Sequence, residues 1–258
     1  YFRTMKRLLG KNIFITGGSA GIGKAIVLAY AKEGANIVFS YKSNQIMADK
    51  IVKEVKKIGQ RCVAIYSDFS DINQIDSVYT KAKAALDGKL DVLVNNVGVA
   101  IKKEFINIPL NQLQSILTIN FIFPFMLIQH FCRDLIADKR PGRIVNISSL
   151  SAESARSCLA DYQSSKAALS MLTKSAAYEM AKHQICINTL APGLTCTIGN
   201  QHQWEENSYL WQQRTSHIPL GRAGQVKDHT GAAIYLASDE ASWTTGSTLT
   251  IDGGQSTV

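Results

Sequence analysis

The chain has 258 residues, of which 46% are hydrophobic and 19% charged, a composition typical of a soluble globular protein with one sizeable core. Its net charge of +8 falls mostly on residues 1–100, which hold 15 Lys and Arg against 8 Asp and Glu. No nucleic-acid-binding motif accompanies that charge, and the longest apolar stretch, 117–128, is too short to span a bilayer. We therefore expect neither a nucleic-acid partner nor a membrane partner.

Strand-like and helix-like segments alternate along the chain. The first strand, 12–16, is a short apolar run that ends in glycines, as buried parallel strands do, and apolar residues then follow at helical spacing over 22–33. A strand over 36–40 precedes a helix over 44–58 that begins at Asn44, a residue that caps helices well. The other strand candidates are 62–66, 91–95, 142–148, 185–190 and 247–251, and the other helical segments lie near 72–86, 111–137, 162–182 and 226–237.

Parallel strands joined by crossover helices predict an α/β fold. We expect a single doubly wound Rossmann-type domain over 1–258, with a seven-stranded parallel sheet and helices on both faces. The stretch 194–218 is irregular and rich in polar and aromatic residues, and a loop of that length in a compact domain often acts as a lid. Its aromatic residues either line a pocket or pack the lid onto the domain; they are Trp204, Tyr209 and Trp211.

The five cysteines are scattered, without a CxxC pair or a partnering histidine. This pattern indicates reduced thiols in a cytoplasmic protein rather than a disulfide framework or a zinc site. The amino-terminal segment lacks the long apolar core of a secretory signal, and Met5 is a candidate start of the natural chain. We expect a cytoplasmic location and no metal.

The junction between the first strand and the first helix reads TGGSAGIG, from Thr16 to Gly23. Glycines let such a turn tighten and let backbone N–H groups approach a pyrophosphate, which the helix dipole also favours. The spacing GxxxGxG differs from the common GxGxxG fingerprint, and glycine-rich turns also occur without a ligand. The position at the first strand-to-helix junction of an alternating chain predicts a dinucleotide site.

Tyr162 and Lys166 form a YxxxK pattern at the start of the helix 162–182. The four-residue offset places both side chains on one helix face, one turn apart. The usual phenol pKa of about 10 is too high for efficient proton transfer at neutral pH, and a nearby ammonium favours the phenolate. Ser149 ends the strand before this helix, where its hydroxyl could either hold a substrate oxygen or cap a turn.

These motifs together resemble the classical short-chain dehydrogenase/reductase family over almost the whole chain. TGGSAGIG is similar to the cofactor loop of that family, and 95–98 (NNVG) is similar to its NNAG motif, with Val97 in place of the usual alanine. Pro192-Gly193 follows the sixth strand as the family's PG does, and 219–254 resembles its C-terminal consensus. The resemblance implies a cofactor-binding half over about 5–120 and a catalytic and substrate-binding half over about 120–258. The residues it implies for the cofactor are Gly17, Ser19, Gly21, Ile22, Gly23, Tyr41, Lys42, Ser43, Asp68, Phe69, Asn96, Val97, Gly98, Tyr162, Lys166, Pro192, Gly193, Thr195 and Thr197.

The choice of cofactor depends on the end of the second strand, where a carboxylate would bind the ribose 2′-hydroxyl and repel a 2′-phosphate. Tyr41 stands in place of that carboxylate, and Lys42 and Ser43 could hold a phosphate by charge and hydroxyl donation. Against this, Lys42 could be an ordinary solvated residue, and Ala20 departs from the NADP-preferring pattern, in which a basic residue often occupies that position. We expect NADP(H) to be favoured over NAD(H).

The resemblance also implies the catalytic roles. Hydride passes between the nicotinamide and a carbinol or carbonyl carbon, Tyr162 exchanges the proton on the oxygen, and Ser149 orients that oxygen. Lys166 binds the nicotinamide ribose and lowers the pKa of Tyr162, while Asn120 connects Lys166 to solvent through water. Asn120 could otherwise be a helix-kinking polar residue before Pro124.

The motifs are closest to those of 3-oxoacyl-(acyl-carrier-protein) reductases and of glucose 1-dehydrogenase-like members. The expected substrate is therefore an acyl-thioester carbonyl or, alternatively, a sugar or polyol. Glu153 and Arg156 lie where family members contact substrate, or are simply solvated. A non-catalytic dinucleotide-binding regulator is a remoter alternative, because such proteins usually lose the tyrosine or the lysine.

The family usually assembles through its two long helices, here 111–137 and 162–182, so we expect a homotetramer or a homodimer. The apolar residues of the first of these helices exceed what one helix face needs for its own core, which supports a buried interface. They are Phe121, Phe123, Phe125, Leu127, Ile128 and Phe131.

Overall fold

The computed structural model describes residues 6–206 and 208–257, so the candidate start at Met5 lies outside the described residues. Seven parallel strands form one sheet in the order β3-β2-β1-β4-β5-β6-β9, which confirms the predicted Rossmann-type topology. The strands are β1 (Asn12–Ile15), β2 (Asn36–Tyr41), β3 (Cys62–Tyr66), β4 (Val92–Asn95), β5 (Gly142–Ile147), β6 (Ile185–Pro192) and β9 (Thr248–Ile251). Their short runs of Ile, Val, Leu and Phe suit strands that are covered on both faces.

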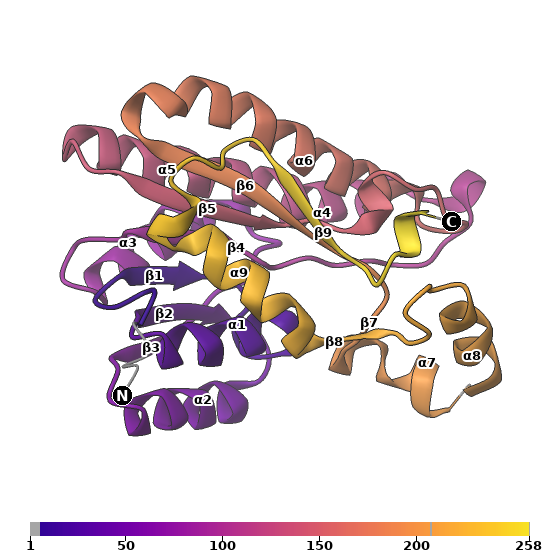
Figure 1. Ribbon diagram of the computed structural model, residues 1–258. Coiled ribbons are helices and arrows are strands. Elements are labelled where there is room, and N and C mark those ends of the chain that lie inside the picture. Colours follow the sequence, from indigo (N-terminus) through magenta and orange to yellow (C-terminus); the bar gives the residue numbers. More distant parts are fainter. Residues whose placement is uncertain (1–5, 207, 258) are drawn as a thin grey trace.

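Helices cover both faces of the sheet (Figure 1). One hydrophobic core lies under α1 (Gly21–Lys32), α2 (Gln45–Lys57) and α9 (Thr230–Ala237), and a second lies under α3 (Ile75–Ala84), α5 (Phe123–Ala137) and α6 (Ala160–Met180). The Tyr30 hydroxyl ties α1 to α9 by donating to the Ala233 carbonyl at 2.7 Å. Asn44 caps α2 as predicted, because its side chain accepts a hydrogen bond from the Met47 N–H.

The helix predicted over 111–137 is a continuous helical segment with a change of pitch inside it. It consists of α4 (Leu110–Leu117), a π-helical turn (Thr118–Ile122) and α5. This segment, Leu110–Ala137, is long and apolar enough to cross a membrane by length and composition, although the stretch 117–128 alone is not. Half of its most apolar window is buried inside the protein, where residues of α5 pack in the second hydrophobic cluster.

The prediction that 194–218 is irregular was wrong. The segment contains β7 (Thr195–Cys196), α7 (Gln201–Glu205) and α8 (Ser208–Ser216), and β7 pairs with β8 (Gly224–Gln225). The two helices lie together at the end of the molecule where β6 leads into β7 (Figure 1). They lack an apolar periodicity because none of their described side chains is fully buried, and polar contacts such as Trp204 Nε1 to Asn200 Oδ1 at 3.2 Å hold them instead.

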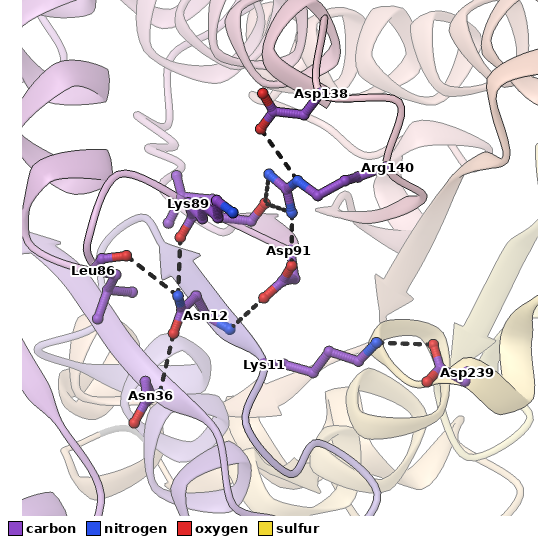
Figure 2. A network of polar contacts seen from close by, with 10 residues as sticks. Lys11, Asn12, Asn36, Leu86, Lys89, Asp91, Asp138, Arg140 and Asp239 are labelled. Carbon is purple, nitrogen blue, oxygen red and sulfur yellow. Dashed lines mark hydrogen bonds and ion pairs between the residues drawn. The ribbon is translucent and has the colours of Figure 1, made fainter. Parts of the chain in front are cut away.

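A polar network joins the amino ends of the central strands (Figure 2). The Asn12 backbone N–H donates to the Asp91 carboxylate at 2.8 Å, and the Asn36 amide donates to Asn12 Oδ1 at 3.1 Å. Arg140, just before β5, donates to the same Asp91 carboxylate at 2.9 Å and to Asp138 at 3.2 Å. These contacts fix β1, β2, β4 and β5 at one edge of the sheet and leave the opposite, carboxyl edge to form the site.

Candidate active site

A cleft of about 1010 Å³ lies at the carboxyl ends of the strands, where ligands bind in open parallel sheets. It runs across the point where the strand order reverses, between β1 and β4. Of the residues that the sequence singled out for catalysis or cofactor binding, Gly23 and Asn120 are not in its wall. The others line it: Gly17, Ser19, Gly21, Ile22, Tyr41, Lys42, Ser43, Asp68, Phe69, Asn96, Val97, Gly98, Ser149, Tyr162, Lys166, Pro192, Gly193, Thr195 and Thr197.

Gly23 shapes the cleft from behind. A Cβ atom at this position would collide with the Gly17 carbonyl oxygen and the Asn96 side chain. Only glycine therefore allows the first turn of α1 to pack this closely against the loop, which is the role of the third glycine in dinucleotide-binding turns. The loop itself is held from the other side by Ser40, whose hydroxyl and carbonyl accept from the N–H groups of Gly17 and Gly18 at 3.0 and 2.9 Å.

Thr16 joins the two loops that meet at the switch point, a role that the sequence reading missed. Its hydroxyl oxygen accepts from the N–H groups of Asn96 and Val97 at 2.8 and 3.1 Å. The Asn96 amide returns the contact by donating to the carbonyls of Thr16 and Gly17 at 2.9 and 3.1 Å. The Asn96 side chain thus positions the glycine loop, and a threonine directly before the glycines was the signal that could have shown it.

The far end of the cleft, at β2 and β3, carries the groups suited to an adenosine. The Lys42 ammonium forms an ion pair with Asp68 at 2.8 Å, and this lysine together with Ser70 lowers the pKa of Asp68 to about 2. Ser67, beside Asp68 in the cleft wall, has a buried hydroxyl oxygen with no partner among the described residues. An orphaned buried hydroxyl in the wall of the cleft fits a ligand that donates or accepts a hydrogen bond there.

Tyr162 and Ser149 both line the cleft, and their side chains are close enough to interact. Ser149 follows β5, and Tyr162 lies in the first turn of α6. Burial raises the pKa of the Tyr162 phenol, and a hydrogen bond with the Ser149 side chain lowers it in part. Ser149 also accepts from the Ser151 N–H at 3.1 Å, so the capping role considered for it is present together with the contact to Tyr162.

Lys166 lies one turn after Tyr162 on α6, as the spacing predicts, and is buried. Its ammonium donates to the Ile147 carbonyl at 2.9 Å, and burial lowers its pKa to about 8. Gly98 makes room for it, since a Cβ there would lie 2.9 Å from the Lys166 Nζ. In the protein alone, burial of both groups outweighs the expected lowering of the Tyr162 pKa, because desolvation disfavours the charged form of each.

Asn120 is fully buried in the π-helical turn. Its side-chain oxygen accepts from the Val99 N–H at 2.9 Å, and its amide donates to the Val99 carbonyl and to Ser165 Oγ, both at 2.9 Å. Ser165 in turn donates to the Tyr162 carbonyl at 2.6 Å. The side chain therefore ties the loop after β4 to the turn that carries Tyr162, and the proton relay through Asn120 stays a prediction.

Two further buried polar residues, Ser148 and Asp161, fix the start of α6, and their side chains gave no signal in the sequence. Ser148 donates to the Lys166 carbonyl at 3.1 Å. Asp161 accepts from the Tyr162 N–H and from Gln112 of α4, both at 2.8 Å. These contacts fix the position of α6 along its axis and its rotation about that axis, and so the direction in which the Tyr162 phenol and the Lys166 ammonium point.

The residues of the cleft fit a nicotinamide dinucleotide. The glycine loop and the first turn of α1 would hold its pyrophosphate, Asp68 and Ser67 its adenosine end, and Lys166 its nicotinamide ribose. When bound, the cofactor supplies a hydride or accepts one. Tyr162 would then hold or release a proton on the substrate oxygen, Ser149 would orient that oxygen, and the ammonium of Lys166 would stabilise the negative phenolate.

Comparison with known proteins agrees with this geometry. The family model described as enoyl-(acyl carrier protein) reductase matches residues 17–256. The chain is 32% identical over 253 residues to an L-rhamnose 1-dehydrogenase (NAD(P)(+)) from Sphingomonas sp. (strain SKA58), covering 97% of this chain and 98% of the relative. It is 32% identical over 244 residues to a 3-oxoacyl-(acyl-carrier-protein) reductase from Staphylococcus aureus (strain Mu50), covering 95% of this chain and 97% of the relative.

A solved structure gives the same result. A putative NAD(P)-dependent gluconate 5-dehydrogenase from Beutenbergia cavernae, with NADP bound at low occupancy, superposes with a TM-score of 0.91 at 29% identity, covering 98% of this chain and 100% of that one. The fold, the cleft with its tyrosine, serine and lysine, and relatives over nearly the full length all agree. The chain belongs to the short-chain dehydrogenase/reductase family and is an NAD(P)-dependent oxidoreductase.

Proposed function

We propose that the protein is an NADP(H)-preferring oxidoreductase that exchanges hydride with the carbonyl or secondary alcohol of a small polar substrate. The end of β2 supports the cofactor preference, because Tyr41 takes the place of a carboxylate and the half-exposed Lys42 ammonium lies beside it. Without a cofactor, the Lys42 ammonium already forms an ion pair with Asp68. A 2′-phosphate would take over part of that pairing, and the ion pair holds the ammonium near the place where the phosphate would bind.

Binding of the two cofactors to Lys42→Ala tests the preference. Charge-assisted hydrogen bonds contribute on the order of 1.5–3 kcal/mol, so we expect the ratio of NADPH to NADH affinity to fall about tenfold to a hundredfold. Tyr41→Asp should move the preference further toward NADH, because the new carboxylate repels the phosphate and accepts from the ribose hydroxyl. Lys53→Ala, an exposed lysine on α2, is the matched control. Equal affinities in the unmodified protein, unchanged by Lys42→Ala, would overturn the preference.

The substrate end of the cleft supports a sugar or polyol over a 3-oxoacyl thioester. Polar side chains of α7, α8 and the loop before α6 line it: Arg156, His202, Gln203 and Arg214. Such groups form hydrogen bonds with hydroxyls. Against an acyl chain each would lose its hydrogen bonds to water and gain none, which costs free energy. The similarity to an L-rhamnose 1-dehydrogenase and to a putative gluconate 5-dehydrogenase is compatible with a sugar substrate, and the equal similarity to a 3-oxoacyl reductase leaves the choice to the side chains of the cleft.

A substrate panel run in both directions tests this choice. Aldoses and polyols with NADP⁺ are compared with an acetoacetyl thioester and NADPH, each also with NAD(H). We expect the larger kcat/KM for a polyhydroxy substrate, and a larger value for the thioester would establish the reductase alternative. Turnover of any member excludes a non-catalytic dinucleotide-binding regulator.

A further inference from the structure

Three cationic side chains from separate parts of the chain meet at the substrate end of the cleft. Lys102 lies in the loop after β4, Arg156 in the loop between β5 and α6, and Arg214 in α8. All three line the same cleft as Tyr162. Asp68 is the one carboxylate in that wall as far as the structure describes it, and it lies at the opposite, adenosine end in its pair with Lys42.

In the part of the chain that the structure describes, these cations have no carboxylate partner. Within residues 6–206 and 208–257, no ion pair involves Lys102, Arg156 or Arg214. Arg214 contacts neutral groups instead: it donates to Gln203 Oε1 at 2.5 Å, and its guanidinium lies 5.4 Å from the centre of the Trp211 ring. Glu206 borders an adjoining hollow of about 440 Å³ with Lys102 and Arg214, but no ion pair joins it to either.

The two arginines lie close enough to repel each other. Burial lowers the pKa of Arg214 and the charge of Arg156 lowers it further. Like charges held together in a partly buried place cost free energy unless an anion lies between them. Other arginines of the described residues have carboxylate partners, as Arg140 has Asp91 and Arg222 has Asp228, and Arg133, which has none, lies away from the cleft and donates to Gln129.

We propose that the substrate carries an anionic group, a carboxylate or a phosphate monoester, which Arg156 and Arg214 bind while Lys102 attracts it from the rim. The planar guanidinium donates two parallel hydrogen bonds to either anion, which suits both. The phosphates of a bound NADP(H) would have their own positions, at the first turn of α1 and beside Lys42. This inference rests on the proposed function, since the anionic group is placed on the molecule that Tyr162 protonates or deprotonates.

Matched substrates measure the contribution of the charge. Gluconate and sorbitol 6-phosphate are compared with neutral sorbitol, each with NADP⁺, in the unmodified protein and in Arg156→Gln/Arg214→Gln. We expect one of the anionic substrates to have at least about tenfold higher kcat/KM than sorbitol, and the double variant to lose about ten- to a hundredfold on that substrate but much less on sorbitol. The anion that responds identifies the group as carboxylate or phosphate.

Two controls separate charge from folding. Arg156→Lys/Arg214→Lys keeps the charge and should recover part of the lost kcat/KM. Arg61→Gln removes an exposed ion pair with Asp87 and should leave kcat/KM unchanged for both the anionic and the neutral substrate. Equal kcat/KM for anionic and neutral substrates, lowered equally by the Gln variants, overturns the inference while leaving the oxidoreductase function intact.

Binding can be measured without turnover. In a Trp204→Phe/Trp243→Phe background the fluorescence of Trp211, which lies against Arg214, reports on the cluster. Inorganic phosphate and gluconate are titrated at saturating NADPH, which fills the cofactor sites and cannot accept a hydride from gluconate. We expect saturable quenching that Arg156→Gln/Arg214→Gln weakens at least about tenfold. Such binding without turnover of any panel member would overturn the proposed function and keep the anion site, and quenching that the arginine variants leave unchanged would overturn the anion site.

Discussion

At the scale of single residues, the chemistry depends on one phenol. Tyr162→Phe keeps the buried ring and removes the hydroxyl to which we assign the proton exchange. We expect turnover to fall by roughly 10²–10⁴, with cofactor affinity retained, because a positioned acid or base contributes about that factor. Steady-state kinetics and a cofactor titration on the same preparation check it. Turnover close to that of the unmodified protein would show that Tyr162 is not the proton-transferring group.

The buried ammonium of Lys166 lowers the free energy of unfolding of the protein. Its pKa in the folded protein is about 8 against an ordinary 10.5, so between these pH values the unfolded chain binds more protons than the folded one, and the free energy of unfolding rises with pH. Below pH 8 both states are protonated and the full cost of burying the charge is present. Lys166→Met should therefore raise the free energy of unfolding at pH 7 by about 1–3 kcal/mol and flatten its rise between pH 8 and 10.5.

Urea unfolding across this pH range measures the effect, with the exposed Lys53→Met as control. The same variant should lose activity and cofactor affinity, since Lys166 is assigned to both. A Lys166→Met protein that is less stable at pH 7 would show that the hydrogen bond to Ile147 outweighs the desolvation of the ammonium.

Most residues that line the cleft at the predicted cofactor and catalytic positions could be found from the sequence, because their motifs are local and ordered along the chain. Their supporting partners could not. The contact between Thr16 and Asn96 spans 80 residues, and the one between Asn120 and Ser165 spans 45. The pair of Lys42 with Asp68 likewise depends on β2 and β3 lying side by side. Such contacts follow from the register of the sheet, which no short pattern encodes.

At the scale of elements, the π-helical turn Thr118–Ile122 joins catalysis to stability. Asn120→Ala would remove the partner of the partly buried Val99 N–H and carbonyl, and buried groups left unsatisfied cost about 1–3 kcal/mol each. We expect the free energy of unfolding to fall by about 2–4 kcal/mol, measured by urea titration.

The pH profile of kcat separates the two roles of Asn120. If the residue acts as a positioning residue, Asn120→Ala lowers kcat at all pH values alike. If it also serves the proton relay, the variant shifts the pH at which kcat is half maximal. Stability equal to that of the unmodified protein would contradict the tie described here.

Sequence patterns located the long elements well and failed for the short ones near the cleft. Cys62–Tyr66 was predicted to the residue because a buried strand needs a continuous apolar run. α7 and α8 were missed because their residues face the cleft and the solvent instead of a core, so no apolar period marks them. The π-helical turn was missed because one inserted residue leaves the apolar spacing of 111–137 almost unchanged.

At the scale of the whole molecule, the assembly stays a prediction. The structure shows that most of the apolar residues first offered for the interface lie in the protein's own core, so other residues must support it. Four of the six apolar residues offered for an interface are buried in the protein's own core: Phe123, Leu127, Ile128 and Phe131. Phe121 and Phe125 pack edge to face and are partly buried, and α6 exposes Met171 and Tyr178, the latter by 89%. We expect a dimer or tetramer that buries these positions.

Sedimentation at micromolar concentration tests the assembly. Met171→Lys/Tyr178→Lys should shift it toward the monomer, because two charges would be buried at the interface, while the exposed Leu9→Lys should not. A stable monomer of the unmodified protein would contradict the prediction. The expected cytoplasmic location, without a nucleic-acid or membrane partner, stays a proposal that fractionation of expressing cells can check.

The sparse burial of α7 and α8 has a consequence for local unfolding of the protein. Their described side chains reach no core, whereas the amino ends of β1, β2 and β4 are fastened by buried strands and the network of Figure 2. Opening this segment therefore exposes little apolar surface and should require far less free energy than global unfolding. Hydrogen exchange should be fastest in 201–217 and slowest in β1 and β4. An anion bridging Arg156 and Arg214 would slow exchange in α8 selectively, so that a ligand would be visible as local protection before any product forms.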